Sequence, residues 1–285
     1  MNKAKRALYW NTLKNGEMQC QLCPHQCKIK ENAAGLCGVR VNQGGELIAT
    51  SYGQVSSMAL DPIEKKPLNM FHPGKRILSI GSFGCNLRCP FCQNYEISIE
   101  YERKAEVTKP GAIVSIAQQT VPNCNIGVAY TYNEPLIGYE FLHDCAQLVH
   151  EAGLYNVLVT NGYINKEPLK ELLPLIDAMN IDLKGFGAFY GKLGGRSDVV
   201  KETIEISHKQ CHVEVATLII TDENEGDIEE IAEWLSSIDP EIPLHISRFF
   251  PRYRYMDRQP TPPETIFRLH ETAKAHLKNI FIGNM

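Results

Sequence analysis

The chain contains the stretch Gly84-Cys85-Asn86-Leu87-Arg88-Cys89-Pro90-Phe91-Cys92-Gln93-Asn94, directly after an apolar run over 76–81 that we predict to be a buried strand. Its cysteines follow the spacing C-x3-C-x2-C. Three thiolates on one tight loop can hold three corners of a cubane iron–sulfur cluster, which normally takes four cysteines. One iron is then left open, which is typical of a catalytic site because a substrate can bind there. A zinc site or a ferredoxin-like carrier would need a fourth ligand from elsewhere, such as Cys124.

Composition excludes several classes of protein. The chain of 285 residues is long enough for one large or two modest domains, and its net charge of −4 with no basic stripe does not favour nucleic acid as a partner. We find no apolar run near the roughly 18 residues that span a bilayer, and so expect no membrane. No apolar segment follows Met1–Arg6, so we predict no export signal. Ten cysteines in such a chain indicate metal in a reducing compartment, and we expect the cytoplasm.

A second group of cysteines lies nearer the N-terminus. Cys20, Cys23 and Cys27 are close together, and Cys37 follows ten positions later. Four cysteines within eighteen residues of Lys, Gly and Asn cannot form a core alone and need a metal to hold the segment together. Structural zinc bound by four thiolates and a second, fully ligated iron–sulfur cluster are both open.

From residue 76 onward the pattern alternates between apolar strands and amphipathic helices. The predicted strands are 76–82, 126–132, 156–160, 178–183, 212–220 and 243–249, and 280–282 is a candidate seventh edge strand. Helical stripes occur between them, and the last helix is predicted to begin with Thr261 as its N-cap. Six βα units predict an α/β fold, a partial (β/α)6 TIM-like barrel, with a small N-terminal Cys-rich metal-binding segment. We predict two regions: 1–75, Cys-rich and linker, and 76–285, the barrel.

Polar residues stand at the carboxyl ends of five predicted strands, where parallel barrels build their sites. Besides the cysteine loop, these ends are 130–135 (Tyr-Thr-Tyr-Asn-Glu-Pro), 160–162 (Thr-Asn-Gly), 180–184 (Asn-Ile-Asp-Leu-Lys) and 245–248 (His-Ile-Ser-Arg). One such end is ordinary as a cap or solvated loop, but five at one rim indicate a site.

The cysteine loop resembles the signature of the radical S-adenosylmethionine (SAM) superfamily, in which the open iron chelates the amino and carboxylate groups of the methionine part. The ammonium of this ligand needs acceptors and its carboxylate needs a cation or donors. Its ribose needs polar partners, and its adenine needs an apolar wall. The residues that we expect to contact SAM are Phe91, Asn94, Asn133, Glu134, Thr160, Asn161, Asp182, Lys184 and Ser247.

The resemblance extends over residues 20–285, to the radical SAM enzymes of the AmmeMemoRadiSam system, which are similar to pyruvate formate-lyase activating enzymes. The matching stretches are 20–25 (CQLCPH), 35–40 (GLCGVR), 61–67 (DPIEKKP), 130–135 (YTYNEP) and 181–185 (IDLKG). The resemblance implies a [4Fe–4S] cluster that reductively cleaves SAM to a 5′-deoxyadenosyl radical. It also implies an electron donor of flavodoxin or ferredoxin type, and AMMECR- or Memo-type proteins are candidate partners.

The substrate is open at this point. An activating enzyme would take hydrogen from a glycine of a partner protein, whereas other enzymes of this kind modify a small molecule or peptide. A non-catalytic iron–sulfur electron-transfer or binding protein is the alternative from another class. Lys65, in a stiff segment that either lines the site or is a solvated linker, and Arg248 are candidate substrate contacts. The glycine-rich stretch 185–196 is expected to be a mobile flap or a plain loop.

Overall fold

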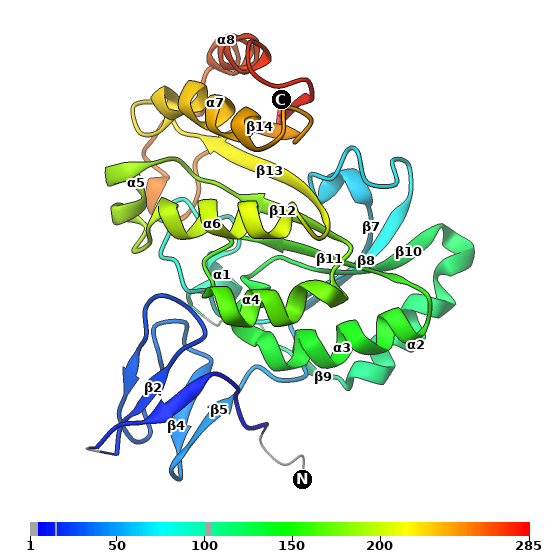
Figure 1. Cartoon of the computed structure of the whole chain (residues 1–285), viewed down its shortest axis with the longest axis vertical. Helices are drawn as coiled ribbons and strands as arrows, with labels where there is room; N and C mark the ends of the chain where they lie inside the picture. The colour runs from blue at the N-terminus through cyan, green and yellow to red at the C-terminus, as the bar shows by residue number, and fades with distance from the viewer. Residues whose placement is uncertain (1–4, 15, 101–103) are drawn as a thin grey trace.

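A computed structural model describes residues 5–14, 16–100 and 104–285 (Figure 1). Eight strands of the described residues form one sheet in the order β15-β14-β13-β12-β11-β10-β8-β7. All its pairings are parallel except that of β7 with β8. The strands are β7 (Ser57–Pro62), β8 (Arg76–Gly81), β10 (Asn125–Tyr130), β11 (Tyr155–Thr160), β12 (Ala178–Asp182), β13 (His212–Ile219), β14 (Leu244–Arg248) and β15 (Ile280–Gly283).

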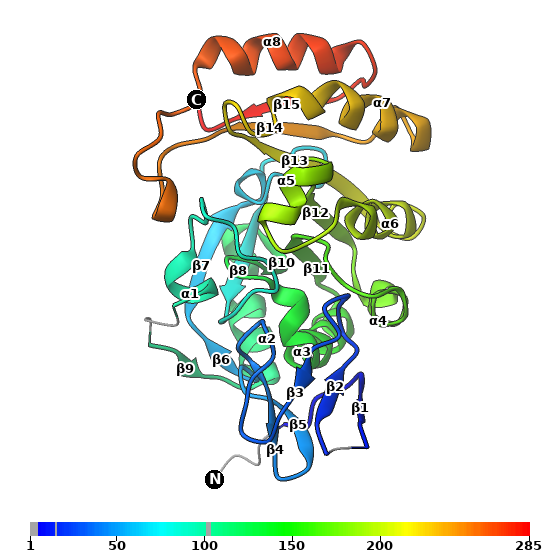
Figure 2. The same ribbon diagram turned by 90° about the vertical axis from the view of Figure 1, so that its left-hand side faces the viewer.

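Helices follow the parallel strands and cover the outer face of this sheet (Figures 1 and 2). They are α2 (Pro110–Gln119), α3 (Tyr139–Glu151), α4 (Lys166–Leu172), α6 (Ser197–Ser207), α7 (Ile228–Ile238) and α8 (Pro263–Lys274). Two short helices, α1 (Tyr95–Ser98) and α5 (Gly187–Lys192), lie in the connections that follow β8 and β12. Because β7 and β15 are edges that do not pair with each other, the barrel is open. The predicted partial (β/α)6 barrel is confirmed, and so is the parallel edge strand near residue 280.

The strand register places one line of small and apolar side chains inside the barrel. Ser79 pairs with Ala129, Ala129 with Val157, and Val157 with Ala178. Ala129, Val157 and Ala178 pack in one buried cluster with Ile63 and Leu68, which come from the connection between β7 and β8. This connection therefore closes the amino end of the barrel and leaves the carboxyl end, where the cysteine loop emerges, for a site.

The solvated-linker interpretation of the segment around Lys65 is wrong. Residues 57–62 form the antiparallel edge strand β7, and the 3-10 helix η1 (Ile63–Lys65) follows it. The side chain of Ile63 is fully buried because it fills the floor of the barrel. The main sheet thus takes its edge strand from the predicted 1–75 region.

The N-terminal segment forms small antiparallel sheets beside the main sheet (Figures 1 and 2). Its strands are β1 (Trp10–Thr12), β2 (Met18–Cys20), β3 (Lys28–Ile29), β4 (Arg40–Gln43), β5 (Glu46–Ala49) and β6 (Gln54–Val55), the last paired with β9 (Glu106–Val107). A buried ion pair joins the segment to α3, with Arg40 Nη1 3.0 Å from Glu140 Oε1 and both side chains 1 % exposed. Leu8 N also donates to Glu140, at 2.7 Å.

Two local predictions differ from the structure. Thr261 is not the N-cap of α8, because its hydroxyl donates to the Ile219 carbonyl of β13 at 2.6 Å, and the helix begins at Pro263 after Pro262. The stretch 185–196 is not a plain loop, since it contains α5 and the side chains of Tyr190 and Leu193 are fully buried. Helix α6, which lies in a region without a predicted stripe, was missed. No helix of the described chain has the length and apolar character to cross a bilayer.

Candidate functional site

The cysteine loop leaves the carboxyl end of β8 through a glycine that no other residue can replace without strain. Gly84 has φ +83°, and a Cβ added to it would lie 2.5 Å from the carbonyl oxygen of Cys37. Gly84 N donates to Ile97 O at 3.0 Å, which fixes where the loop starts. The loop therefore packs directly against the N-terminal segment.

Arg88 holds the middle of the loop in place. Its backbone N–H donates to Leu193 O at 2.9 Å, and its guanidinium donates to the carbonyl of Cys85 at 2.8 Å. A second guanidinium nitrogen donates to the carbonyl of Leu36. One arginine thus ties the loop both to α5's C-terminal side and to the turn that carries Cys37.

The thiols of Cys85, Cys89 and Cys92 are desolvated but have N–H donors nearby. Burial raises the pKa of all three thiols, to about 11 for Cys89. Leu87 N donates to Cys85 Sγ at 3.4 Å, and Asn161 Nδ2 donates to it at 3.6 Å. Because metals bind the thiolate, loading this site with a metal centre would release protons.

The donor set of the cysteine loop suits a cluster. In a cubane each thiolate binds its own iron, and N–H groups commonly point at the sulfurs, as those of Leu87 and Asn161 do at Cys85 Sγ. The residues present therefore fit the [4Fe–4S] cluster that the loop predicts.

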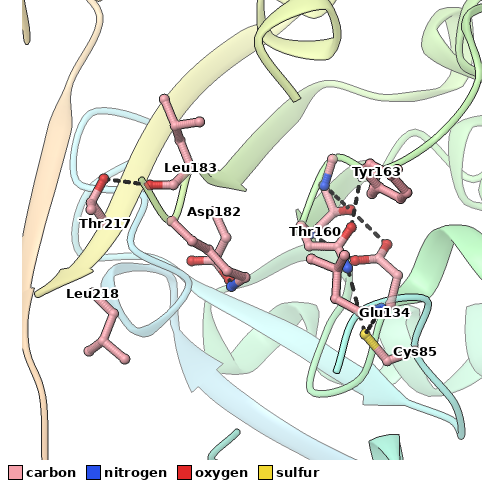
Figure 3. Close-up of polar contacts among 12 residues, drawn as sticks. Cys85, Glu134, Thr160, Tyr163, Asp182, Leu183, Thr217 and Leu218 are labelled. Carbon is pink, nitrogen blue, oxygen red and sulfur yellow. Dashed lines mark hydrogen bonds and ion pairs between the residues drawn. The ribbon is translucent and has the colours of Figure 1, made fainter. Parts of the chain in front are cut away.

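Glu134 is buried beside Cys85 (Figure 3). Its Oε1 accepts from Thr160 Oγ1 at 2.7 Å and from Leu136 N at 2.9 Å, and its Oε2 accepts from Asn161 N at 2.7 Å. Burial raises the pKa of Glu134 to about 7, against these three hydrogen bonds, which lower it. One acceptor position on Oε2 is left for a further donor.

Asn94 and Asn133, both predicted SAM contacts, hold the backbone around the site. Asn133 Oδ1 accepts from Ser82 N at 2.8 Å, and its Nδ2 donates to Phe83 O at 2.9 Å. Asn94 Nδ2 donates to Tyr132 O at 2.7 Å. The structure thus brings both residues to the cysteine loop, with their side-chain amides already bonded to the backbone.

Asp182 and Lys184 form the opposite side of the site, at the end of β12. Lys184 Nζ lies 3.1 Å from Asp182 Oδ2, and the Asp182 side chain is 42 % exposed whereas that of Lys184 is 14 % exposed. Burial lowers the pKa of Lys184, but the charges of Asp182 and Cys89 outweigh it, so the net pKa is raised and Lys184 stays cationic. Figure 3 shows Asp182 between Glu134 and Leu218.

Phe91 and Ser247 complete the predicted set at two different places. Phe91 is buried and stacks with Phe189 of α5, with ring centroids 6.0 Å apart and planes 5° apart. Ser247 on β14 pairs with Leu218 and Gly283, so it follows Asp182 on the same face of the sheet but two strands away. The rim is therefore continuous from β8 to β14.

The two candidate substrate contacts do not reach the cysteine loop. Lys65 lies at the other end of β8, is 67 % exposed in its side chain, and pairs with Asp61 at 3.5 Å. Arg248 Nε donates to Thr261 O at 2.6 Å, and its guanidinium lies over the ring of Phe250.

Sequence reasoning missed Asn86, Phe189 and Tyr190 as residues of this site. Tyr190 Oη accepts from Lys184 N at 3.1 Å, and Asn86 Oδ1 accepts from Asn161 Nδ2 at 3.0 Å. Asn86 lies within the decisive stretch itself, where its position between two ligand cysteines was the available signal. Phe189 and Tyr190 of α5 were missed because the glycines on both sides of them made the stretch 185–196 resemble a loop.

Fold and site together define a class: α/β enzymes that hold a three-cysteine iron–sulfur loop at the carboxyl end of the first strand of a partial barrel. Residues 79–235, more than half of the chain, match the Radical SAM superfamily, and the chain belongs to this superfamily. Membership implies a [4Fe–4S] cluster and SAM, as predicted.

Similar proteins include two from Methanocaldococcus jannaschii. The protein MJ0808 is 41 % identical over 99 % of this chain and 85 % of its own length. MJ1227, described as a putative glycyl-radical enzyme activating enzyme, is 26 % identical over 74 % of this chain and 90 % of its own length.

Among solved structures, Streptococcus suis SuiB has a similar fold, with a TM-score of 0.54 at 16 % identity. The match covers 73 % of this chain and 48 % of SuiB, so this chain spans about half of that protein. The similarity supports the barrel topology alone.

Proposed function

We propose that this chain uses a cluster on Cys85, Cys89 and Cys92 to cleave SAM and then takes a hydrogen atom from a glycine of a partner protein, as an activating enzyme does. The observation that carries the proposal is the loop itself: three thiols, with N–H donors beside them, at the carboxyl end of β8. When bound, the reduced cluster supplies the single electron that breaks the bond between sulfur and the 5′ carbon of SAM.

The protein's part is to hold SAM at the open iron. Glu134, with one acceptor position left beside Cys85, is the proposed partner of the SAM ammonium. Lys184, which is cationic and next to Cys89, is the proposed partner of the carboxylate. Opposite charges on the two sides of the loop would orient the zwitterionic end of SAM.

The remaining predicted contacts divide into direct and positioning roles. Asp182, which is partly exposed at the rim, is proposed to accept from the ribose hydroxyls, and Ser247 extends this edge. Phe91 provides an apolar wall for adenine. Asn133 and Thr160 act by holding the backbone and Glu134, since their side chains are already bonded.

A cleft beside the cysteine loop supports a protein segment as substrate. It is lined by Ser57 of edge strand β7, by Gln93 and Asn94 after the cysteines, and by Tyr132 and Arg252. Ser57 belongs to the edge strand of the open barrel, so the cleft lies beside that edge. The similarity to MJ1227 supports the same substrate class.

The proposed partners follow from the AmmeMemoRadiSam resemblance. An external donor of flavodoxin or ferredoxin type would reduce the cluster, and an AMMECR- or Memo-type protein is the proposed carrier of the substrate group. Their binding to the chain can be measured directly with purified proteins.

The first experiment asks for SAM cleavage. The anaerobically reconstituted protein, with its iron content confirmed, is reduced with dithionite in the presence of SAM, and 5′-deoxyadenosine is measured. We expect product from the wild type and from Cys124→Ser, whose cysteine is exposed and away from the loop, but none from Cys89→Ala. A fully loaded wild type without product would reject the proposal.

The second experiment asks for the substrate. Candidate partner proteins carrying deuterated glycine are incubated with the reduced enzyme and SAM. Deuterium in 5′-deoxyadenosine supports the activating role, whereas deuterium only from a labelled small molecule or peptide would favour that alternative.

A further inference from the structure

Four thiols of the N-terminal segment surround one cavity. Cys20 ends β2, Cys23 and Cys27 lie on the turn that follows, and Cys37 lies on the next turn. Leu22, Ile29 and Ile137 also line the cavity, which makes its wall largely apolar. Cys20 N donates to Cys27 O at 3.0 Å, so the backbone already holds two of the cysteines together. Four thiols around an enclosed space are a candidate metal site.

The connection of these cysteines to the cysteine loop favours a cluster over zinc. A closed zinc site is structural and carries no electrons. Cys23 instead begins a hydrogen-bonded path of side chains that ends at Cys85. In a cluster each thiolate binds a separate iron, and such a centre can pass electrons along a path of this kind.

The side chain of Arg40 independently indicates that a group binds in this cavity. Its side chain lines the same cavity and is 1 % exposed. Two of its nitrogens are paired, with Glu140 and with the Leu8 carbonyl, but its Nε–H is buried and has no acceptor among the described residues. A buried donor without an acceptor is costly, and the sulfides of a cluster would accept from it.

One residue lies between this cavity and the cysteine loop. Asn86 lines the cavity, and its side chain hydrogen-bonds to Cys23. The same side chain accepts from Asn161, whose Nδ2 also donates to Cys85 Sγ. Asn86 is 1 % exposed and is bonded in sequence to Cys85. Bonds through Asn86 and Asn161 thus connect the two groups of cysteines.

We propose that Cys20, Cys23, Cys27 and Cys37 bind a second, fully ligated iron–sulfur cluster that passes single electrons by way of Asn86 toward Cys85. A reduced donor of flavodoxin or ferredoxin type loses one electron, the second cluster gains and then loses it, and the centre on the cysteine loop gains it. No bond is made or broken in this transfer. The electron relay rests on the proposed function, because the electron acceptor is the cluster proposed on the cysteine loop. The binding of the second cluster does not depend on that function.

The binding test uses a variant whose cysteine loop can no longer bind iron. The variant Cys85→Ala/Cys89→Ala/Cys92→Ala is reconstituted anaerobically with iron and sulfide, and iron, labile sulfide and zinc are counted. We expect about two or about four irons per chain with matching sulfide, and a paramagnetic signal on reduction. One zinc without iron, or no metal, would overturn the proposal. This count does not involve SAM, so it is independent of whether the wild type cleaves SAM.

The matched variant Cys20→Ala/Cys37→Ala keeps the cysteine loop, and circular dichroism checks that it is folded. Its iron content should fall by the number of irons that the triple variant retains, whereas Cys124→Ser should keep the full content. The relay is tested by the rate of 5′-deoxyadenosine formation with a flavodoxin-type donor divided by the rate with dithionite. We expect this ratio to fall roughly tenfold or more, and an unchanged ratio would contradict the relay.

Discussion

The side-chain amide nitrogen of Asn161 donates hydrogen bonds to two acceptors, the sulfur of Cys85 at 3.6 Å and the side-chain oxygen of Asn86 at 3.0 Å. The backbone N–H of Asn161 donates to Glu134 Oε2 at 2.7 Å, and this hydrogen bond fixes the position of Asn161 directly after β11. The residue directly after β11 thus supplies a hydrogen bond to a proposed cluster ligand.

Replacing Asn161 with alanine removes this N–H···S hydrogen bond. Donors to sulfur stabilise the more negative, reduced state, so the reduction potential of the cluster should fall, by roughly 20–60 mV if the bond is worth about 0.5–1.5 kcal/mol. An anaerobic redox titration followed by electron paramagnetic resonance measures the change. The control is Asn165→Ala, which loses a bond to the Gln21 carbonyl instead, and an equal shift in the control would contradict the role of Asn161.

Gly84→Ala should lower the iron content of the cysteine loop. The substitution places a Cβ 2.5 Å from the Cys37 carbonyl at φ +83°, so the loop must move. The left-handed conformation alone costs about 1–2 kcal/mol. Gly111→Ala is the matched control, because its Cβ would meet nothing within 4 Å and α2 gains a better helix former. Iron counts and thermal unfolding after reconstitution distinguish the two variants, and normal iron in Gly84→Ala would refute the prediction.

Lys184→Met should weaken SAM binding and keep the cluster. A charge-assisted hydrogen bond is worth about 1.5–3 kcal/mol, so we expect a roughly ten- to hundredfold increase in the dissociation constant of SAM, measured by calorimetry under anaerobic conditions. Lys192→Met is the control, since the side chain of Lys192 is 56 % exposed and pairs with Glu223. Unchanged affinity in Lys184→Met would remove Lys184 from the proposed SAM contacts.

The barrel contains another buried carboxylate, Glu214, whose ionisation we expect to contribute to stability at acid pH. Burial alone would raise the pKa of Glu214, but hydrogen bonds from His212, His245, Met70 N and Asn69 N lower it to about 2. The carboxylate therefore stabilises the fold above its ordinary value of 4.5, and this contribution is lost as pH falls from there toward 2.

Urea unfolding of Glu214→Gln tests this assignment. We expect a loss of about 2–4 kcal/mol near neutral pH, and a smaller difference from the wild type at about pH 3. The surface variant Glu205→Gln should change little at either pH. A difference that does not depend on pH would show that packing, and not ionisation of Glu214, is responsible.

The sequence predicted the barrel because its apolar runs alternate with helical stripes. The predicted ends of each barrel strand lie within two residues of the observed ends. Strand β7 was not predicted as part of this sheet. Its Pro62 and Asp61 are typical of turns, and its strand conformation depends on pairing with β8, which local pattern does not show.

The residues around the cysteine loop were predictable by type but not by role. Asn133 and Thr160 were found from their positions after strands, yet their hydrogen bonds to Ser82 N and Glu134 depend on how three strand ends meet. The same holds for Arg248, which lies at the carboxyl end of β14 as predicted but donates to the Thr261 carbonyl. Tertiary contacts, which sequence spacing does not contain, decide these directions.

The buried pair of Arg40 and Glu140 fixes the position of the N-terminal segment relative to the barrel. Removing one member of such a pair typically costs about 3–5 kcal/mol, so the N-terminal segment stays fixed on α3. For the protein substrate that we propose, the expected contact surface is therefore the unpaired edge of β7 beside the cleft, and surface substitutions there should alter recognition of that substrate without disturbing SAM cleavage.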